Sequence, residues 1–577
     1  KLGKFIVKRS KVVLLTFIIT TIIAGAVGSL SFGRLDSGGY SDLNSDSAKA
    51  AEYVIDVFGA EEPVAVMVVD SASSTIDDPA VASTAIEIEK KIQAHEGVSK
   101  TYSYWSTGGS PTMKSNDGKA GFILVYSDLD AFDWDALGSL GASLQEEFDG
   151  KYKNVHIYAS GAGVITYAIN HKIEKDLILA ESIAIPLTFL LLVFVFGALV
   201  ASATPLFVGV TAILGSFFII YILTLFTNVS VFALNLITGL GLGLGIDYAL
   251  LMVNRFREEL HNGHSVEESV VTTVATAGKT VFYSGLTVLV TMASLLFFPL
   301  EFLKSFGYAG VAVITFAVIG AAIALPALLA VLGEKVDKGV VRKSAITPKE
   351  DGRWAHTARN VMQRPVPVVL ACLVVLGILA APVTNISFAQ VDSRVLPASN
   401  PAAIAAEVVD SRFDGLIGSP IEVVVPKGVG RESEINAFLD KVKGIEGIVR
   451  VGAIEVYGQD IRVQVISSVP SRSTDSMQVI HSIRDLDQPS GTLIGGAAAD
   501  FTDSQDGIAR TLPLALGWIA LSVLILIFIF TGSIILPIKA VILNGLSLVA
   551  TLGAITWIFI DGHLKWLVGD FTVTGTL

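Results

Sequence analysis

The sequence predicts a membrane α-helical bundle with two α+β domains outside the membrane, arranged as an internal duplication. Three observations predict this fold class: an apolar composition, nine apolar runs, and two polar segments with the same order of elements. Of the 577 residues, 52% are hydrophobic and only 16% are charged. Soluble domains carry roughly 25% charged residues, so this composition indicates a membrane protein with sizeable polar parts.

Nine runs of roughly 20 apolar residues are each long enough to cross the hydrocarbon core of a bilayer. They are 12–30, 183–200, 205–226, 231–253, 281–299, 306–332, 366–384, 512–531 and 535–560. The first follows a basic flank, which predicts a cytoplasmic N-terminus and an uncleaved anchor. Counting crossings from there puts the basic loop 333–365 in the cytoplasm, as the positive-inside rule requires.

The predicted domains follow from these spans. They are a first span (1–30), a first extracytoplasmic domain (31–180), five spans (181–332), the basic loop (333–365), a seventh span (366–384), a second extracytoplasmic domain (385–510), two spans (511–560) and a final extracytoplasmic segment (561–577).

Both outer domains have the predicted order β-α-β-β-α-β, which is the order of ferredoxin-like domains. In the first domain the elements are 63–70, 78–95, 98–104, 121–128, 133–149 and 155–160. In the second they are 421–426, 432–442, 448–456, 461–468, 474–486 and 491–496. The shared order predicts an internal duplication with a period of roughly 330–355 residues.

One acidic residue, Asp247, lies beside Tyr248 in the apolar run VFALNLITGLGLGLGIDYALLMV. An ionised carboxylate at that depth costs at least ~3 kcal/mol, so intramembrane acids are rare and usually functional. The preceding glycines have two Gly-xxx-Gly spacings, which predict close helix packing: Gly239, Gly241, Gly243 and Gly245. We expect Asp247 to take up and release a proton at this interface; the alternative is a structural acid that hydrogen-bonds a neighbouring helix. The repeat period puts its counterpart beyond Leu577, in a tenth span missing from the sequence.

The cytoplasmic segment 254–280 is predicted to form a helical hairpin. Gly263 ends its first helix, and Ser265 with Glu268 has the spacing of a capping box for the second. Arg255 and Arg257 are expected to meet lipid headgroups.

Several classes of function are not expected. A net charge of −12 argues against nucleic acid as a partner, and the single cysteine, Cys372, rules out a disulfide within the chain. The sequence has no phosphate-binding Gly-x-x-x-x-Gly-Lys-Ser/Thr motif, which argues against ATP as the energy source. His261 and His264 are expected to be solvent-exposed residues rather than metal ligands, and we predict no cofactor and no enzymatic activity.

The sequences GLGLGLGIDYALLMVNRFREEL (239–260) and TAGKTVFYSGLTVLV (276–290) resemble the MmpL (mycobacterial membrane protein large) branch of the RND (resistance-nodulation-division) superfamily. The resemblance extends over the whole chain. It implies an RND-type bundle with two porter domains, in the cell inner (plasma) membrane. It also implies proton-driven export of a lipid or glycolipid, such as the mycolic-acid precursor trehalose monomycolate, toward the cell envelope.

Carried over to this sequence, the proton relay of the family would comprise Asp247, Tyr248 and Ser284. Leu251 departs from the pattern, because mycolate-exporting members tend to have phenylalanine there. The implied partners are the lipid, protons, the membrane and accessory envelope proteins, and both a monomer and a trimer remain open. The alternative functions are efflux of small hydrophobic drugs or siderophores and a non-transporting, sterol-sensing-like scaffold.

Overall fold

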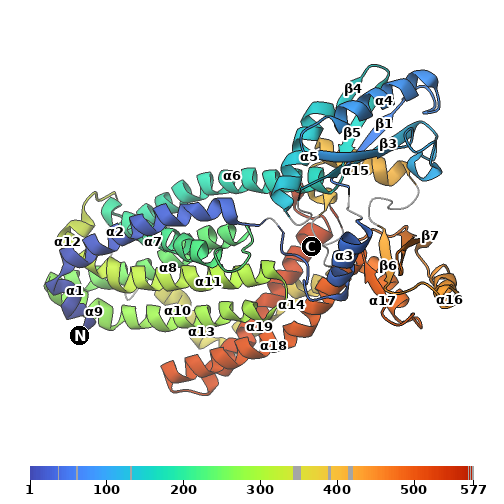
Figure 1. Cartoon of the computed structure of the whole chain (residues 1–577). Coiled ribbons are helices and arrows are strands. Elements are labelled where there is room, and N and C mark those ends of the chain that lie inside the picture. Colours follow the sequence, from blue (N-terminus) through green and yellow to red (C-terminus); the bar gives the residue numbers. More distant parts are fainter. Residues whose placement is uncertain are drawn as a thin grey trace. The chain divides into compact units, whose positions relative to one another are not determined.

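The computed structural model describes residues 1–36, 38–59, 63–129, 133–341, 352–387, 392–413, 420–568, 571 and 573–574 (Figure 1). The chain divides into two compact units, which we call the helical unit and the α+β unit. The helical unit contains 1–39, 176–381 and 509–551, and the α+β unit contains 40–175, 382–508 and 552–577. Each unit is therefore assembled from three stretches that are distant in sequence.

Among the described residues, nine helices are long and apolar enough to span a membrane, and they correspond in order to the nine predicted spans. They are Ser10–Arg34, Ala162–Phe196, Leu199–Leu223, Ala233–His261, Val266–Phe297, Glu301–Asp337, Pro365–Asn385, Ala497–Thr531 and Ile535–Ile560. The protein is accordingly a multi-pass membrane protein.

These spans consist of one or more helical elements. The elements are α2 (Ser10–Gly28) with η1 (Ser29–Arg34), α6 (Ala162–Phe196), α7 (Leu199–Leu223), α8 (Ala233–His261), α9 (Val266–Ala275), α10 (Ala277–Ala293) with η3 (Ser294–Phe297), α11 (Glu301–Ile319), η4 (Gly320–Ala324), α12 (Leu325–Leu332) with η5 (Gly333–Asp337), α14 (Pro365–Ala380) with η6 (Ala381–Asn385), α18 (Ala497–Thr531) and α19 (Ile535–Ile555) with η8 (Thr556–Ile560). The short helix α1 (Leu2–Lys8) precedes α2, and α13 (Arg353–Gln363) precedes α14.

The predicted span 183–200 extends beyond its helix, which is a correction to the sequence analysis. Helix α6 ends at Phe196, Gly197 has a φ of 71°, and α7 begins at Leu199. Glycine takes this left-handed conformation without a steric penalty, so it ends the helix there. Both α6 and α18 are 35 residues long and begin well before their predicted spans, because hydropathy marks only the apolar part of a helix.

Helices α7, α8 and α11 pack against one another and form the centre of the helical unit (Figure 1). The buried core there includes Val208 and Ala212 of α7, Val253 of α8 and Val313 of α11. Small residues bring the helices close: a Cβ added at Gly215 of α7 would come within 2.3 Å of the Phe316 ring. Packing of this kind is typical of membrane helices, because lipid supplies no hydrophobic force to bring them together.

The predicted hairpin after α8 is present. Gly263 has a φ of 89°, and the Ser265 side chain accepts a hydrogen bond from the Glu268 backbone N–H at the start of α9. The Glu268 side chain in turn accepts from the Ser265 backbone N–H at 3.0 Å, which completes the capping box.

Arg257 does not face lipid headgroups, contrary to the prediction. Its guanidinium group is buried and donates to Asp337 Oδ1 at 2.7 Å and to the Phe196 carbonyl oxygen at 3.0 Å. The last carbonyl groups of a helix have no partner within that helix, so Arg257 satisfies one of them at the end of α6. Arg255 is half-buried and pairs with Glu258 and Glu259 of its own helix.

The α+β unit contains two antiparallel sheets. The first has strand order β2-β3-β1-β5-β4, from β1 (Ala65–Asp70), β2 (Val98–Ser103), β3 (Ala120–Ser127), β4 (Gly150–Tyr152) and β5 (Val155–Ser160), with helices α4 (Pro79–Gln93) and α5 (Trp134–Phe148). The second has order β7-β8-β6-β9, from β6 (Ile421–Val425), β7 (Ile448–Tyr457), β8 (Asp460–Ser467) and β9 (Leu493–Gly495), with α16 (Glu432–Val442) and α17 (Thr474–Arg484).

The two faces of strand β1 belong to different cores. Met67 and Val69 pack with α4 and α5, whereas Val66 and Val68 on the opposite face pack with Phe413. Alternation with a period of two explains how one short strand supplies both cores. In the register of the sheet, Val68 lies opposite Phe122 of β3 and Tyr158 of β5.

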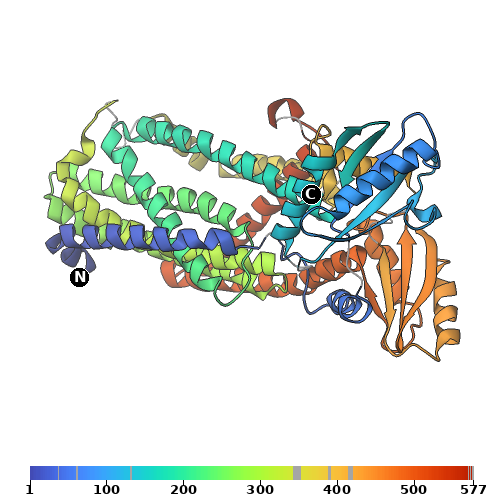
Figure 2. The same ribbon diagram turned by 45° about the horizontal axis from the view of Figure 1, so that its top comes forward.

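Two helices that pack against the sheets were not predicted, α3 (Asp46–Phe58) and α15 (Pro401–Arg412), and neither was the short strand β4. Helix α3 packs against β6 and β9 of the second sheet, whereas α15 packs against β5 of the first sheet (Figures 1 and 2). Each sheet is thus covered in part by a helix from the opposite half of the chain. A local signal was present for both helices, because Ser45 and Asn400 have the N-cap side chains that mark helix starts.

Asp503 of α18 attaches α3 to the second sheet domain. Its carboxylate accepts hydrogen bonds from the Ser47 backbone N–H at 3.0 Å and from the Arg484 guanidinium at 2.5 Å. A negative charge at the first turn of α3 also suits the positive end of the helix dipole.

Arg412 attaches α15 to the first sheet. Its guanidinium lies 2.9 Å from Asp70 Oδ1 and 2.8 Å from Asp117 Oδ2, and its carbonyl oxygen accepts from the Asn116 N–H. Burial raises the pKa of Asp117, but hydrogen bonds from Ser115, the Lys119 backbone and Arg412 together lower that pKa to about 2. The aspartate is therefore fully ionised at neutral pH and holds the arginine in place.

We expect Arg412→Met to loosen α15 from the first sheet by on the order of 2 kcal/mol, because Asp70 would be left nearly buried without its cation. Hydrogen exchange measured on the intact chain should show faster exchange of the amides in 401–412. Lys443→Met is the matched control, since the Lys443 side chain pairs with exposed Asp440 three residues earlier and its loss should change stability by less than about 0.5 kcal/mol. If the α15 amides were equally protected from hydrogen exchange in both variants, Arg412 would not be what attaches α15 to the first sheet.

The predicted segment 561–577 contains the short helix α20 (Lys565–Val568). Residues 569, 570, 572 and 575–577 of that segment, and 342–351 of the basic loop, lie outside the described residues.

Candidate functional site

The four predicted packing glycines of α8 fall on two faces of the helix. A Cβ at Gly245 would lie 2.7 Å from the Gly209 Cα atom, and one at Gly241 would lie 2.6 Å from the Ile213 side chain of α7. Gly239 and Gly243 have no described atom within 4 Å of their Cβ positions. The pair Gly241/Gly245 therefore brings α7 and α8 into backbone contact. The pair Gly239/Gly243 forms a row along α8 with no described atom beside it, which we call the open row.

Asp247 continues this open row. It follows Gly239 and Gly243 at intervals of four residues, so the three positions share one side of α8. The Asp247 side chain is exposed and has no hydrogen bond or ion pair with a described residue. Because the two glycines of the open row have no side chains, a second helix could approach this side of α8 closely and contact the Asp247 carboxylate.

Tyr248 turns to a different side of α8, because successive residues are about 100° apart on a helix. The residue is buried, with 6% of its surface exposed, and its hydroxyl group lies 3.6 Å from the Cβ position of Gly285 on α10. Among the described residues this hydroxyl has no well-aligned hydrogen-bond partner, although the Ser284 side chain is close enough to interact with it. The structure therefore brings Tyr248 and Ser284 together, with Asp247 adjacent in the chain.

Ser284 lies on the side of α10 that faces α18. It lines a hollow of about 250 Å³ with hydroxyl side chains on one wall and apolar side chains of α18 on the other. The lining residues are Thr280, Tyr283, Ser284, Thr287, Val288, Leu526, Ile527 and Phe530. The Tyr283 and Phe530 rings meet at 4.9 Å across this hollow.

Thr280 and Thr287 were not recognised as candidates in the sequence. They lie four residues before and three residues after Ser284, which is the spacing of one helix face, and this signal could have identified them. The Thr287 hydroxyl donates to the Tyr283 carbonyl oxygen at 2.8 Å, so its lone pairs stay available to accept a hydrogen bond from water or another donor.

The two histidines that could have suggested a metal are held separately. His264 Nδ1 lies 2.8 Å from Glu259 Oε2, while His261 Nδ1 lies 2.8 Å from the Arg257 carbonyl oxygen. No cluster of three His, Cys, Asp or Glu side chains with the arrangement of a metal site occurs in the part of the chain that the structure describes.

These features define a class of protein: a multi-pass membrane protein with two antiparallel α+β sheets and an acid–tyrosine pair in a glycine-rich span. The sequence profile of the MMPL family matches residues 40–368 and 458–574. Since the match covers most of the chain, this protein belongs to the MMPL family.

Three relatives illustrate the range of the family. The chain is 32% identical to a putative membrane protein of Streptomyces coelicolor, over 98% of this chain and 78% of that protein. It is 29% identical to the trehalose monomycolate exporter MmpL3 of Mycobacterium tuberculosis, over 98% of this chain and 65% of that protein. It is 28% identical to the mycolic acid-containing lipids exporter MmpL11 of Mycolicibacterium smegmatis, over 75% of this chain and 47% of that protein. The chain thus spans about two-thirds of the length of MmpL3.

Proposed function

We propose that this protein exports or flips a lipid or glycolipid from the inner membrane toward the cell envelope, driven by the proton gradient. The observation that carries the proposal is the Asp247 carboxylate on α8, beside Tyr248 and near Ser284 of α10. A carboxylate within an apolar span is costly unless it is used, and proton relays are a main use. Asp247 would take up and release the proton, and Tyr248 and Ser284 would pass it along.

The open row of α8 supports a coupling role for Asp247. Gly239 and Gly243 allow a second helix to approach to backbone distance, which would place a polar group of that helix beside the carboxylate. A change in the charge of Asp247 would then alter the packing of two helices directly. This is how protonation could drive a change of conformation.

The two sheets suit the handling of an amphiphile outside the membrane. We propose that both are ferredoxin-like porter domains that arose by duplication, because the central strand of each pairs antiparallel with two others in the same topological order. The exchange of α3 and α15 between them ties the domains together. A lipid moving between such domains would meet two linked surfaces instead of open solvent.

The class of substrate is inferred from relatives. Two of the relatives carry names that specify lipid export, one for trehalose monomycolate and the other for mycolic acid-containing lipids. A lipid of that type is amphiphilic, with long apolar chains and a polar head. We propose trehalose monomycolate as the first substrate to test, in a plasma membrane with the N-terminus of the protein in the cytoplasm.

Collapse of the proton gradient provides the direct test. In cells that express the whole protein, a protonophore should stop the movement of trehalose monomycolate to the outer surface within minutes, while ATP is kept at its normal level. Mass spectrometry of lipids on the purified protein would check the substrate separately. Continued movement of trehalose monomycolate without a proton gradient would refute proton coupling.

A further inference from the structure

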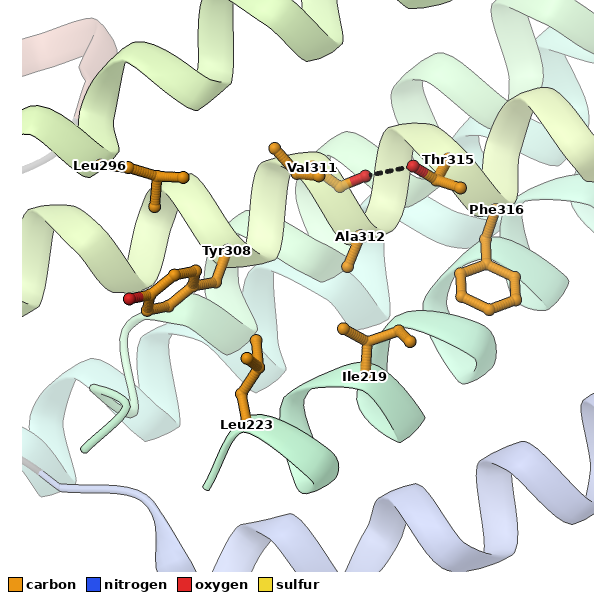
Figure 3. A pocket seen from close by; sticks show the side chains of 8 residues that line it. All are labelled: Ile219, Leu223, Leu296, Tyr308, Val311, Ala312, Thr315 and Phe316. Carbon is orange, nitrogen blue, oxygen red and sulfur yellow. Dashed lines mark hydrogen bonds between the residues drawn. The ribbon is translucent and has the colours of Figure 1, made fainter. Parts of the chain in front are cut away.

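A second membrane-embedded crevice lies away from the proposed relay, at the end of the helical unit where α11 begins. Its walls come from the end of α7, from η3 and from residues 308–316 of α11, and its volume is about 330 Å³. Figure 3 shows Ile219 and Leu223 of α7 facing Tyr308, Ala312 and Phe316 of α11. This size falls at the lower end of the range for ligand pockets in proteins.

The lining of this crevice is almost entirely apolar. The Thr315 hydroxyl donates to the Val311 carbonyl oxygen at 2.7 Å, so this polar group is already satisfied (Figure 3). The crevice is formed by three of the apolar spans, in a region where the surrounding medium is lipid. An empty apolar crevice loses the dispersion contacts of its walls, so a flexible apolar chain is the occupant that it favours.

A cation lies on the same side of α11 as the crevice. Lys304 precedes Tyr308 by four residues and Val311 by seven, so the three positions share one helix face. Its ammonium group has no ion pair with a described residue, and Glu301 one turn earlier does not pair with it. The Tyr308 hydroxyl points away from Ala312 and Phe316 (Figure 3). Lysine and tyrosine at the end of a span are typical of the headgroup level of a membrane.

We propose that this crevice binds one phospholipid of the bilayer, with an acyl chain between α7 and α11 and its phosphate beside Lys304. The apolar walls account for the chain, and the Lys304 ammonium group, one turn before Tyr308, accounts for the phosphate. A glycolipid without phosphate would gain no ion pair from Lys304, so the site favours a phospholipid over a sugar-headed substrate. The proposal does not depend on transport or on proton coupling.

The test uses the whole protein, purified in detergent and stripped of lipid. Palmitoyl-oleoyl phosphatidylglycerol with a photoreactive acyl chain is titrated in, bound copies are counted by native mass spectrometry, and cross-linked peptides are identified. We expect wild-type protein to retain one tightly bound copy that cross-links to the peptide containing Tyr308 to Phe316.

Two variants test the cation and the apolar crevice separately. Lys304→Gln should weaken binding about fivefold, the effect of one lysine near a charged membrane surface. Ala312→Phe should fill the crevice and abolish the cross-link. Lys119→Gln and Ala371→Phe are the matched controls, because both positions are exposed and outside the crevice, and they should retain wild-type binding.

Three results would contradict phospholipid binding in this crevice. Wild-type binding in Lys304→Gln would overturn it, as would a cross-link elsewhere or stronger retention of a phosphate-free glycolipid. If Ala312→Phe elutes as an aggregate, Lys304→Gln alone decides, because Lys304 is only half-buried and lies one turn before the lining residue Tyr308.

Discussion

Replacing Asp247 by asparagine should reduce the proposed lipid export to background, by at least ~100-fold, and leave insertion and folding intact. Proton transfer by a positioned side chain contributes about that much, and an amide cannot titrate at physiological pH. Because Asp247 is exposed, and Asp247→Asn is nearly isosteric, the substitution breaks no hydrogen bond or ion pair within the part of the chain that the structure describes. The measurement is the rate of trehalose monomycolate export at matched expression.

Glu301→Gln provides the matched control for Asp247→Asn. Glu301 is an acid at the start of a span, α11, and neutralising it removes a negative charge of the same kind without touching α8. Export should continue in this variant. If Asp247→Asn transports at the wild-type rate, Asp247 is a structural acid and the proposed coupling is wrong.

A methyl group added at Gly245 should destabilise the helical unit. The Cβ of Gly245→Ala would lie 2.7 Å from Gly209 Cα and 2.8 Å from Gly209 N, and backbone atoms cannot rotate away as a side chain can. Overpacking of a core costs about 1–3 kcal/mol, and here α7 and α8 must separate. We expect a loss near the upper end of that range, seen as a lower midpoint of thermal unfolding and a lower yield of monodisperse protein.

Gly517→Ala is the control for helix propensity. Gly517 lies in α18, and no described atom is found within 4 Å of its Cβ position. Alanine is the better helix former by about 1 kcal/mol, so this variant should be neutral or slightly stabilised. Of the two identical substitutions only Gly245→Ala should therefore lose stability, and a Gly245→Ala protein as stable as Gly517→Ala would contradict the close contact of α7 and α8.

Much of the helical unit could be predicted from local sequence. Hydropathy located the nine spans, and the Ser265–Glu268 spacing located the start of α9, because both signals depend only on neighbouring residues. Boundaries were less accurate where a helix continued into polar sequence, as α6 does from Ala162.

The candidate site was predictable to different degrees. Asp247 stood out because a charge in an apolar run is visible in the sequence, whereas Ser284 came only from the resemblance to a family. The hollow that Ser284 shares with Thr287 and Phe530 could not be foreseen, since it depends on α10 and α18 lying side by side. Arg257 was assigned to lipid headgroups because its partners, Asp337 and the Phe196 carbonyl group, are distant in sequence.

For this protein, composition, hydropathy and short spacings were sufficient to predict a multi-pass membrane protein with two α+β domains and one intramembrane acid. These signals depend only on residues that are close in sequence, so they can be recognised without knowledge of the fold. Only the tertiary structure showed which glycines of α8 contact α7 and which sheet each of α3 and α15 covers. Both depend on the packing of segments that are distant in sequence. Such choices depend on shape and on pairs of charges such as Arg412 with Asp70, which no periodicity in the chain records.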